Sequence, residues 1–596
     1  MSTYKAPLTD MRFALFDVLG AEAQFQKLGF ADATRDLLDA IYDEGARFTE
    51  TILAPLNEAG DRIGSRFDKT TGTVATPPGF KPAYVQFVEG GWPGLTSPAE
   101  FGGQGLPHAA AVPFKEMIDA ANLAWSTFPL LSHGAIDALQ HHGEAWQQET
   151  FLKPLVEGRW TGSMCLTEPH CGTDLGLLKT KAEPQADGSY GITGTKIFIT
   201  AGEHDMVDNI LHLVLARLPD APAGSKGISL FIVPKVKVAR DGTVGAANTV
   251  RCGSIEHKMG LHGSSTCVMN FDGAQGYLVG QPNKGLMAMF TMMNTARLGV
   301  GLQGLALSDR AYQNALRYSR DRLQSRSLSG PKFPDKPADP IIVQPDVRRM
   351  LLTCKAIIEA GRVMAYHATL LVDGAARGTS EEERAQADAL LDFVTPIVKG
   401  CLTEWGIECT YNALQCFGGH GYIGEHGIEQ LARDARITTL YEGTTGIQAL
   451  DLLGRKVMQL KGTGLKLFLG MIEQFCNEQS GNPAVAEFIG PLREKAAQWQ
   501  QLTLQIGQRA AANPEEIGAA AYDYLMYSGY VTLAYWWARS VAAAETSSQS
   551  EKFKAGKRET ARFYFARILP RTLAHAAAIA TPASTLTALD EAAFDN

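Results

Sequence analysis

The sequence predicts a mainly α-helical protein with one central β domain. Residues 32–41 space their apolar side chains three and four positions apart, which is the pattern of an amphipathic helix. Between about residues 160 and 280 the pattern changes to short apolar and β-branched runs separated by Gly, Asp and Pro turns, which is typical of strands. From about residue 284 onward, long segments rich in Ala, Leu and Arg indicate helices again.

The order of these patterns predicts four domains. The N-terminal helical domain, residues 1–159, contains a Gly- and Pro-rich loop at 91–105. The middle β domain spans 160–283 and has strand-like runs such as 192–200. A helical bundle follows at 284–462, and a Gly-rich segment then leads into an additional helical domain at 463–596.

The composition is that of a globular protein. Of the 596 residues, 45% are hydrophobic and 20% are charged. The net charge of -8 argues against nucleic acid as a partner, and from Gly470 onward 13 acidic residues outnumber 11 basic ones. No run approaches the roughly 20 apolar residues of a membrane span. The first seven residues carry no apolar segment, so we expect no signal peptide and a cytoplasmic location.

Nine cysteines are scattered through apolar contexts without a Cys-x-x-Cys pair. An odd, dispersed set of this kind predicts reduced, buried thiols, with neither disulfides nor a metal site.

Residues 299–304 match the dinucleotide-binding pattern G-x-G-x-x-G. That pattern indicates a nucleotide site only between a strand and a helix, where the pyrophosphate meets the N-terminus of the helix. Both flanks here have helical patterns, so we expect these glycines to lie within a helix and to allow close packing of a neighbouring helix.

Four separated motifs carry groups suited to chemistry. They are residues 164–174, 196–202, 294–297 with Arg322 further on, and 415–422 leading to 441–446. Each has an ordinary structural interpretation when it is taken alone. Thr-Glu-Pro is a common turn, a strand explains the second motif, arginines on helices are usually solvated, and Tyr-Glu-Gly-Thr is equally typical of a surface turn with a solvated Glu.

Taken in this order, the motifs resemble the acyl-CoA dehydrogenase family of flavoproteins, over about residues 91–453. The chain most resembles the long subgroup with an extra C-terminal helical domain, which includes bacterial fatty-acyl-CoA and 3-methylmercaptopropionyl-CoA dehydrogenases. The resemblance implies the fold of that family: an N-terminal helical domain, a middle β-barrel-like domain and a C-terminal four-helix bundle. It also implies FAD as cofactor, an acyl-CoA substrate, an electron-transferring flavoprotein as acceptor, and a homodimer or a dimer of dimers.

The resemblance assigns roles residue by residue. Glu442 is expected to be the catalytic base, and Ala296 stands where some members carry the acid instead. Thr173, Asn294, Arg297 and Gly443 are expected to contact substrate. The expected FAD contacts are Met164, Leu166, Thr167, Gly172, Thr173, Phe198, Ile199, Thr200, Arg322, Gln324, Gln344, Gln415, Cys416, Phe417, Gly418, Gly419, Thr444 and Gly446.

Three positions depart from the common family pattern. Residues 170–171 are His-Cys where many relatives have Gly-Ala. Phe198 stands where Trp is frequent, so it keeps an apolar wall beside the flavin but has no indole N–H to donate. Gly446 stands where Gln is frequent, so that any contact with FAD there comes from the backbone.

Alternative functions are an acyl-CoA oxidase, which passes electrons to O₂, and a 3-methylmercaptopropionyl-CoA dehydrogenase. Nucleic-acid binding, as in the alkylation-response homologues, is disfavoured by the slightly acidic C-terminal region. A membrane-surface role for that region, as in long-chain members, is less favoured than a soluble enzyme.

Overall fold

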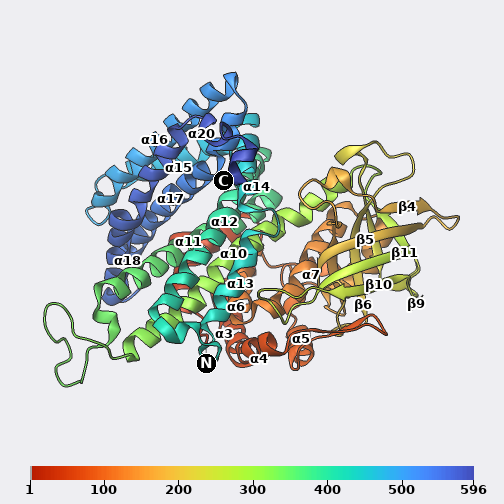
Figure 1. The fold of residues 1–596 in the computed structure, drawn as a ribbon, viewed down its shortest axis with the longest axis horizontal. Helices are drawn as coiled ribbons and strands as arrows, with labels where there is room; N and C mark the ends of the chain where they lie inside the picture. The colour runs from red at the N-terminus through yellow and green to blue at the C-terminus, as the bar shows by residue number, and fades with distance from the viewer. Residues whose placement is uncertain (1–2, 596) are drawn as a thin grey trace. The chain divides into compact units, whose positions relative to one another are not determined.

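The computed structural model describes residues 3–595, which divide into two compact units (Figure 1). The sheet unit contains residues 47–106 and 121–299, and the helical unit contains residues 3–46, 107–120 and 300–595. The chain is mainly helical with a central sheet, as the sequence predicts.

The sheet unit is built around a seven-stranded sheet whose strand order is β3-β6-β7-β11-β5-β4, with β10 also paired to β11. β3 and β6 are parallel and the other pairs are antiparallel. Every residue of β6 is buried, which explains why its sequence is a continuous apolar run with little alternation. The strands are β3 Trp160–Cys165, β4 Lys181–Pro184, β5 Tyr190–Thr200, β6 Asn209–Ala216, β7 Ser229–Pro234, β10 Val250–Ile255 and β11 Thr266–Val279.

Two small ribbons and several helices complete the sheet unit. The ribbons pair β1 Arg66–Asp68 with β2 Thr73–Ala75, and β8 Val236–Val238 with β9 Val244–Ala247. The helices are α4 Ala54–Ile63, α5 Phe80–Glu89, α7 Leu123–His142, α8 Ala145–Gln147 and α9 Lys153–Val156.

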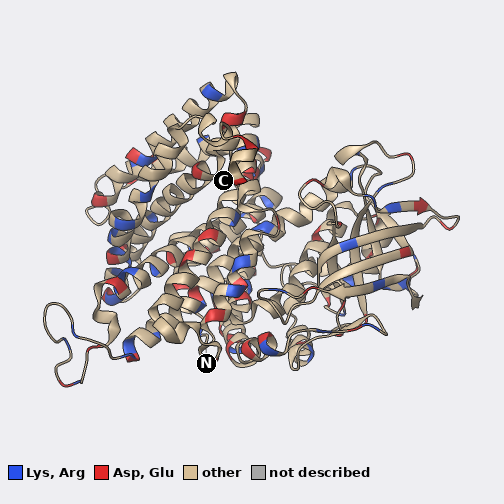
Figure 2. Ribbon diagram, in the orientation of Figure 1, with Lys and Arg blue, Asp and Glu red and all other residues tan. Residues whose placement is uncertain are grey.

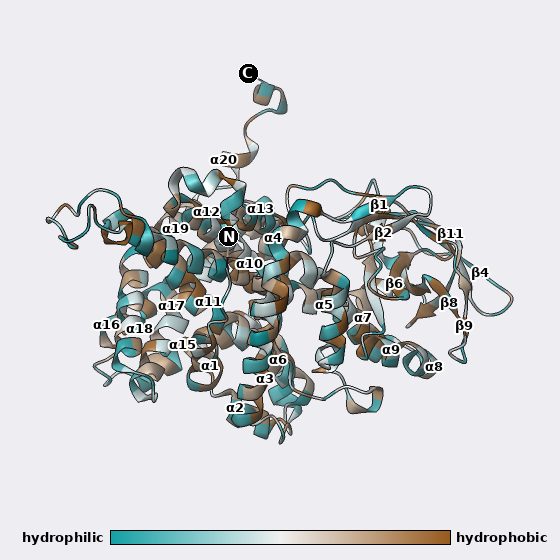
Figure 3. Cartoon of the chain, turned by 90° about the horizontal axis from the view of Figure 1, so that it is seen from below, coloured by the Kyte–Doolittle hydropathy of each residue, from teal (hydrophilic) through white to brown (hydrophobic). Residues whose placement is uncertain are grey.

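The helical unit is formed by long helices, of which α11 and α12 pack along one another (Figure 1). Teal and brown residues occur on the same helices in Figure 3, as expected for helices that bury one face. The helices are α1 Leu8–Arg12, α2 Ala21–Lys27, α3 Arg35–Phe48, α6 His108–Ala121, α10 Gly285–Asp321, α11 Pro345–Arg377, α12 Glu381–Cys416, α13 Ile428–Arg436, α14 Thr445–Leu450, α15 Thr463–Glu478, α16 Ala486–Ala512, α17 Glu515–Thr546, α18 Glu551–Phe563, α19 Thr572–Ala580 and α20 Ser584–Thr587; α3, α6 and α10 continue across the division between the units.

The G-x-G-x-x-G sequence lies inside α10, as its helical flanks predict. A Cβ atom on Gly301 would come within 2.8 Å of the Val398 side chain, and one on Gly304 within 2.5 Å of the Leu402 carbonyl oxygen. Gly406 on α12 has Gly304 as its nearest neighbour. These three glycines, here called the glycine seam, bring α10 and α12 into backbone contact and form no nucleotide site.

A buried ionic network ties the first helix and the C-terminal helices to the bundle. The Arg362 guanidinium, 1% exposed, lies 2.7 Å from a Glu116 carboxylate oxygen and 3.5 Å from one of Asp309. Asp10 pairs with Arg362 and with Lys557 of α18. Five elements that are distant in sequence therefore share one charge cluster, and a partner removed from it would leave buried charge uncompensated.

Asp309 is expected to make stability depend on pH. Burial raises the pKa of Asp309 from 3.8 to about 7, against the opposing charge of Arg362. The folded state therefore holds a proton that the unfolded state has lost between pH 3.8 and about 7, and this group destabilises the fold as pH rises through that window. In denaturant titrations, the stability of Asp309→Asn relative to wild type should increase with pH across the same window. Asp346→Asn, at an exposed site on α11, is the control, and a pH-independent difference for Asp309→Asn would contradict the assignment.

All nine cysteines are free and buried, as the sequence predicts.

Blue and red residues both occur along α16 and α18 in the C-terminal region (Figure 2). None of the helices in residues 3–595 combines the length and the hydropathy that crossing a bilayer requires.

Candidate active site

The turn formed by residues 441–446 presents Glu442 from a strained backbone. Glu442 has φ 57° and Gly443 has φ 88°, so two consecutive residues adopt the left-handed region. Gly443 does so without a steric penalty, whereas the conformation of Glu442 costs on the order of 1–3 kcal/mol and persists only where neighbouring groups impose it. The turn ends where Thr444 caps α14, its hydroxyl accepting a hydrogen bond from the Ile447 N–H.

Buried polar side chains hold the backbone of this turn. The Lys399 ammonium donates to the Gly443 carbonyl oxygen at 2.6 Å, and the Gln448 amide donates to the Glu442 carbonyl oxygen at 3.1 Å. Lys399 and Gln448 are both 0% exposed. Charge-assisted bonds in a buried setting are among the stronger ones, so the carbonyls of both left-handed residues are firmly held.

The residue before Glu442 is anchored to α10. The Tyr441 hydroxyl donates to the Gln303 side-chain oxygen, and burial raises the Tyr441 pKa well above its ordinary value. Gln303 lies on α10 between Gly301 and Gly304 of the glycine seam and is 0% exposed. The turn therefore has anchors on α10, α12 and α14.

In the sheet unit, the Thr-Glu-Pro turn is fixed by a buried ion pair. Glu168, 3% exposed, lies 2.9 Å from the Lys196 ammonium, which is 0% exposed. Its carboxylate also accepts hydrogen bonds from the Lys179 and Thr180 N–H groups and from the Thr180 hydroxyl. Burial opposes ionisation of Glu168, but the Lys196 charge and these donors outweigh it and lower the pKa of Glu168.

The same ion pair aligns the first motif with the second. Lys196 donates to the Leu166 carbonyl oxygen at 2.9 Å, and the Ile197 N–H donates to the Thr167 carbonyl oxygen at 2.9 Å. These bonds join Leu166 and Thr167, just after β3, to β5, whose end carries Phe198, Ile199 and Thr200. Met164 lies within β3, and Gly172 and Thr173 follow the turn.

Glu168, His170 and Cys171 place their potential ligand atoms within 4.8 Å of one another. Glu168 is already neutralised by Lys196, whose ammonium would repel a cation. The His170 ring nitrogen instead lies 3.0 Å from the Leu177 carbonyl oxygen, which ties down the loop where this chain departs from Gly-Ala.

The end of β5 exposes an apolar ring. Phe198 is 60% exposed and has φ 59°, a rare conformation for an aromatic residue. Thr200, two residues further along the same strand, and Thr167 are half-buried. An exposed ring and hydroxyl-bearing side chains are suited to the face and the polar edge of a flat heteroaromatic ligand.

In the helical unit, Arg322, Gln324 and Gln344 flank a loop organised by Asp339. The Asp339 carboxylate accepts hydrogen bonds from the N–H groups of Ser327, Lys332 and Phe333. Burial of Asp339 opposes ionisation, but these bonds lower its pKa to about 2. The Gln344 amide donates to the Arg326 carbonyl oxygen, and this bond joins the two ends of the loop. Arg322 is exposed.

Tyr318 connects this loop to the Gly-Gly turn after α12. Its ring stacks on Phe417 with centroids 4.2 Å apart, and its hydroxyl lies 2.9 Å from His420 Nδ1. A Cβ atom on Gly418 or Gly419 would meet nothing within 4 Å, so both glycines expose bare backbone. Gln415 is exposed and Cys416 is buried beside them.

The third motif lies on the first half of α10. Asn294 is exposed, whereas Arg297 is 7% exposed and Ala296 is buried. Asn294, Ala296 and Arg297 belong to the sheet unit, whereas Arg322 belongs to the helical unit.

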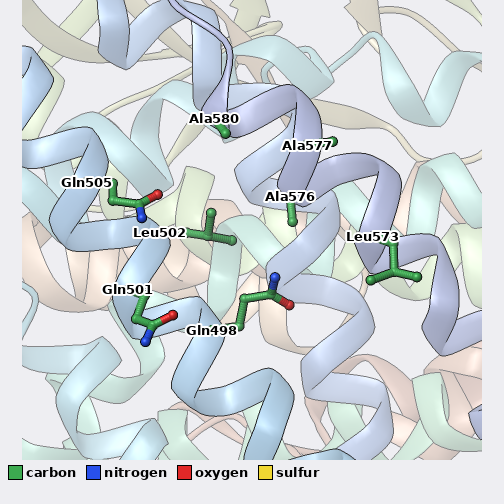
Figure 4. A pocket seen from close by; sticks show the side chains of 8 residues that line it. All are labelled: Gln498, Gln501, Leu502, Gln505, Leu573, Ala576, Ala577 and Ala580. Atoms are coloured by element: carbon green, nitrogen blue, oxygen red, sulfur yellow. The ribbon is translucent and has the colours of Figure 1, made fainter.

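A cavity of about 320 Å³ lies between α16 and α19 (Figure 4). Gln498, Gln501 and Gln505 line one side, and Leu573, Ala576 and Ala577 line the other. None of its lining residues is ionisable or belongs to the predicted site, so this cavity does not supply the acid–base chemistry.

Sequence reasoning missed the supporting residues Lys399, Gln303, Gln448, Asp339 and Tyr318. Lys399 had a signal, because a lone lysine within the apolar run 393–402 must be buried together with a partner. Gln303 lay in a segment interpreted as packing alone. Asp339 and Tyr318 have no local signal, since their partners are defined by the fold.

Each unit separately carries groups that suit one part of a flavin dinucleotide. In the sheet unit, Phe198 offers an apolar face and Thr167 and Thr200 offer hydroxyls. In the helical unit, Arg322 offers an exposed cation of the kind that binds a pyrophosphate. The open backbone at Gly418 and Gly419 allows close approach of a phosphate or an adenylate.

Comparisons with known proteins agree with this chemistry. Residues 38–159, 163–274 and 283–458 match the N-terminal, middle and C-terminal domains of acyl-CoA dehydrogenases. Residues 468–590 match a family described as acetyl-CoA dehydrogenase C-terminal like.

Individual relatives extend the match over nearly the whole chain. The 3-methylmercaptopropionyl-CoA dehydrogenase of Ruegeria pomeroyi is 44% identical over 91% of this chain and 92% of its own length. A broad-specificity linear acyl-CoA dehydrogenase of Mycobacterium tuberculosis is 33% identical over 100% of both chains. An acyl-CoA dehydrogenase of Bacillus anthracis, solved in complex with FAD, superposes with a TM-score of 0.75 at 21% identity and covers 94% of this chain and 90% of that one. The chain therefore belongs to the acyl-CoA dehydrogenase family and is an FAD-dependent oxidoreductase.

Proposed function

We propose that the protein catalyses α,β-dehydrogenation of an acyl-CoA thioester to the trans-2-enoyl-CoA, with Glu442 as the base. The observation that supports this proposal most directly is the left-handed turn, in which buried donors hold the backbone around a half-buried carboxylate. A turn that is strained and yet over-determined is typical of a residue whose position matters for function.

In the proposed reaction Glu442 removes the pro-R α-proton of the thioester, and the β-hydrogen leaves as hydride. Bound FAD would supply the acceptor for that hydride, its N5 atom. The task of Glu442 is a general-base step, in which a positioned side chain typically contributes a factor of about 10²–10⁴. Gly443, Thr173, Asn294 and Arg297 are proposed to contact the substrate.

The remaining residues predicted from the sequence are proposed to hold the cofactor. Arg322 would bind the pyrophosphate bidentately, Phe198 would shield the flavin, and Thr167 and Thr200 would hydrogen-bond it. The other proposed contacts are Met164, Leu166, Gly172, Ile199, Gln324, Gln344, Gln415, Cys416, Phe417, Gly418, Gly419, Thr444 and Gly446. The electrons are proposed to pass to an electron-transferring flavoprotein, and the enzyme to act as a cytoplasmic homodimer.

A narrower candidate substrate is 3-methylmercaptopropionyl-CoA. The relative that is 44% identical is named for its action on this thioester, which favours it over a straight-chain fatty-acyl-CoA of any particular length.

The function is tested by mixing the FAD-loaded protein anaerobically with a panel of acyl-CoAs, from short to long chain, together with 3-methylmercaptopropionyl-CoA. We expect bleaching of the oxidised flavin and formation of a trans-2-enoyl-CoA with at least one of them. If no thioester in the panel bleaches the flavin, the proposed reaction is wrong. Rapid peroxide formation in air, without need of an electron-transferring flavoprotein, would identify an oxidase instead.

A further inference from the structure

We propose that Lys399 is a positioning residue for proton abstraction: its buried ammonium fixes the Gly443 carbonyl and thereby holds Glu442 in its left-handed conformation. This inference rests on the proposed role of Glu442 as base. It assigns a function to a lysine that takes no part in the proposed contacts with substrate or cofactor.

The burial of Lys399 calls for an explanation. Its side chain is 0% exposed on α12, between the buried apolar residues Val398 and Cys401. Burying an ammonium costs several kcal/mol unless its hydrogen bonds and charge are compensated. An apolar side chain would avoid that desolvation cost but could not donate to the turn, so the donor itself is the feature that the site uses.

The bond that Lys399 makes is directed at the point of strain. It reaches the carbonyl of Gly443, the residue next to Glu442, at 2.6 Å. Gln448 donates to the Glu442 carbonyl at 3.1 Å and to that of Gly443 at 3.4 Å. The two side chains together hold both carbonyls of the left-handed pair. Because backbone dihedrals set where a side chain starts and which rotamers it adopts, this clamp sets the position of the carboxylate.

The glycine seam fixes where Lys399 stands. A Cβ atom on Gly301 would lie 2.8 Å from Val398, the residue preceding Lys399 in sequence. The same segment of α10 provides Gln303, which accepts the Tyr441 hydroxyl bond. Close contact of α10 with α12 therefore sets the spacing between the two anchors that hold the turn on either side of Glu442.

A clamp of this kind affects the chemical step more than binding. Displacing a reacting group by about 1 Å can cost on the order of 10²-fold in rate. We therefore expect Lys399→Met to lower kcat by about 10- to 100-fold while KM and FAD content stay within about twofold of wild type. Gln448→Met removes the second donor and should show the same pattern.

The control is Lys456→Met. Lys456 is also buried, 5% exposed, and its ammonium pairs with Asp392 of α12, two helical turns before Lys399. This variant loses a buried ammonium without touching the turn, so it should lose stability but keep the kcat of the folded enzyme.

The experiment compares the FAD-loaded enzymes in steady-state turnover and with a 3-thia-acyl-CoA, whose sulfur in place of the β-carbon allows α-deprotonation but no hydride loss. Wild type should deprotonate this probe with a visible change in the flavin spectrum. Lys399→Met and Gln448→Met should bind the probe but deprotonate it weakly. The proposal is overturned if Lys399→Met keeps wild-type kcat and probe deprotonation. It is also overturned if Lys399→Met lowers kcat and probe deprotonation no more than Lys456→Met does, because the loss then comes from removing a buried ammonium and not from the turn. If Lys399→Met does not fold, Gln448→Met decides between the same outcomes.

The failure of this proposal is distinguishable from that of the base assignment. Turnover or probe deprotonation that survives in Glu442→Gln would remove Glu442 as base, whatever the Lys399 variants show. Loss in Glu442→Gln together with unaffected Lys399→Met and Gln448→Met would leave the base in place and remove only the clamp.

Discussion

Glu442→Gln is expected to lower kcat by about three orders of magnitude while the protein keeps its FAD. Glutamine matches glutamate in size, and the carbonyls of residues 442 and 443 would still accept from Gln448 and Lys399. The amide cannot take up the α-proton, so flavin reduction by substrate should be the step that slows. Anaerobic rapid mixing with an acyl-CoA measures that step directly, separately from turnover with an acceptor.

The matched control is Glu425→Gln, the same substitution at an exposed residue in the segment Gly424–His426. This variant should reduce its flavin at the wild-type rate. Normal flavin reduction in Glu442→Gln would show that another group removes the proton. Loss of FAD from the variant would show instead that the turn, and not the base alone, had been damaged.

Glu168→Gln is expected to destabilise the protein by about 3 kcal/mol, because it leaves the Lys196 ammonium buried without its counter-charge. The same change weakens the acceptor for three donors from residues 179 and 180. Since Lys196 also holds the Leu166 carbonyl, weaker retention of FAD should accompany the loss of stability. Denaturant unfolding and the fraction of flavin retained after gel filtration measure the two effects.

The pH dependence of this difference has a definite sign. The pKa of Glu168 is lowered in the folded state, so its stabilisation is present above the ordinary value of 4.5 and is lost as pH falls below it. The gap between wild type and Glu168→Gln should therefore shrink in acid. The double variant Glu168→Gln with Lys196→Met should recover part of the loss at neutral pH, because no buried charge remains. A double variant less stable than Glu168→Gln alone would argue against the ion pair as the cause.

The sequence predicts the order of helical and strand segments well, because the spacing of apolar residues along the chain is a local property. The change near residue 160 and the helical flanks of the 299–304 glycines are both visible in windows of about a dozen residues. The fold class, the family and its cofactor are confirmed. The division into four domains and the roles of the individual site residues stay predictions.

The supports of the site could not be predicted because their partners are remote in sequence. Lys399 and Gly443 are 44 residues apart, and Gln303 and Tyr441 are 138 apart. A local pattern marks Tyr441 and Glu442 as a turn but does not show which donors hold it. Likewise, the left-handed φ of Glu442 has no signal in its own residue type, since glutamate rarely adopts it.

The burial of all nine cysteines gives the chain its own unfolding reporter. A thiol reagent reacts with exposed thiolates, whereas the folded molecule buries all nine cysteines. Labelling of the eight cysteines other than Cys416, which is proposed to contact FAD, therefore counts opened chains whether or not flavin is bound. For the variants described above, thiol labelling therefore separates a protein that has lost its cofactor from one that has lost its fold. Flavin absorbance alone does not separate them, because it changes in both cases.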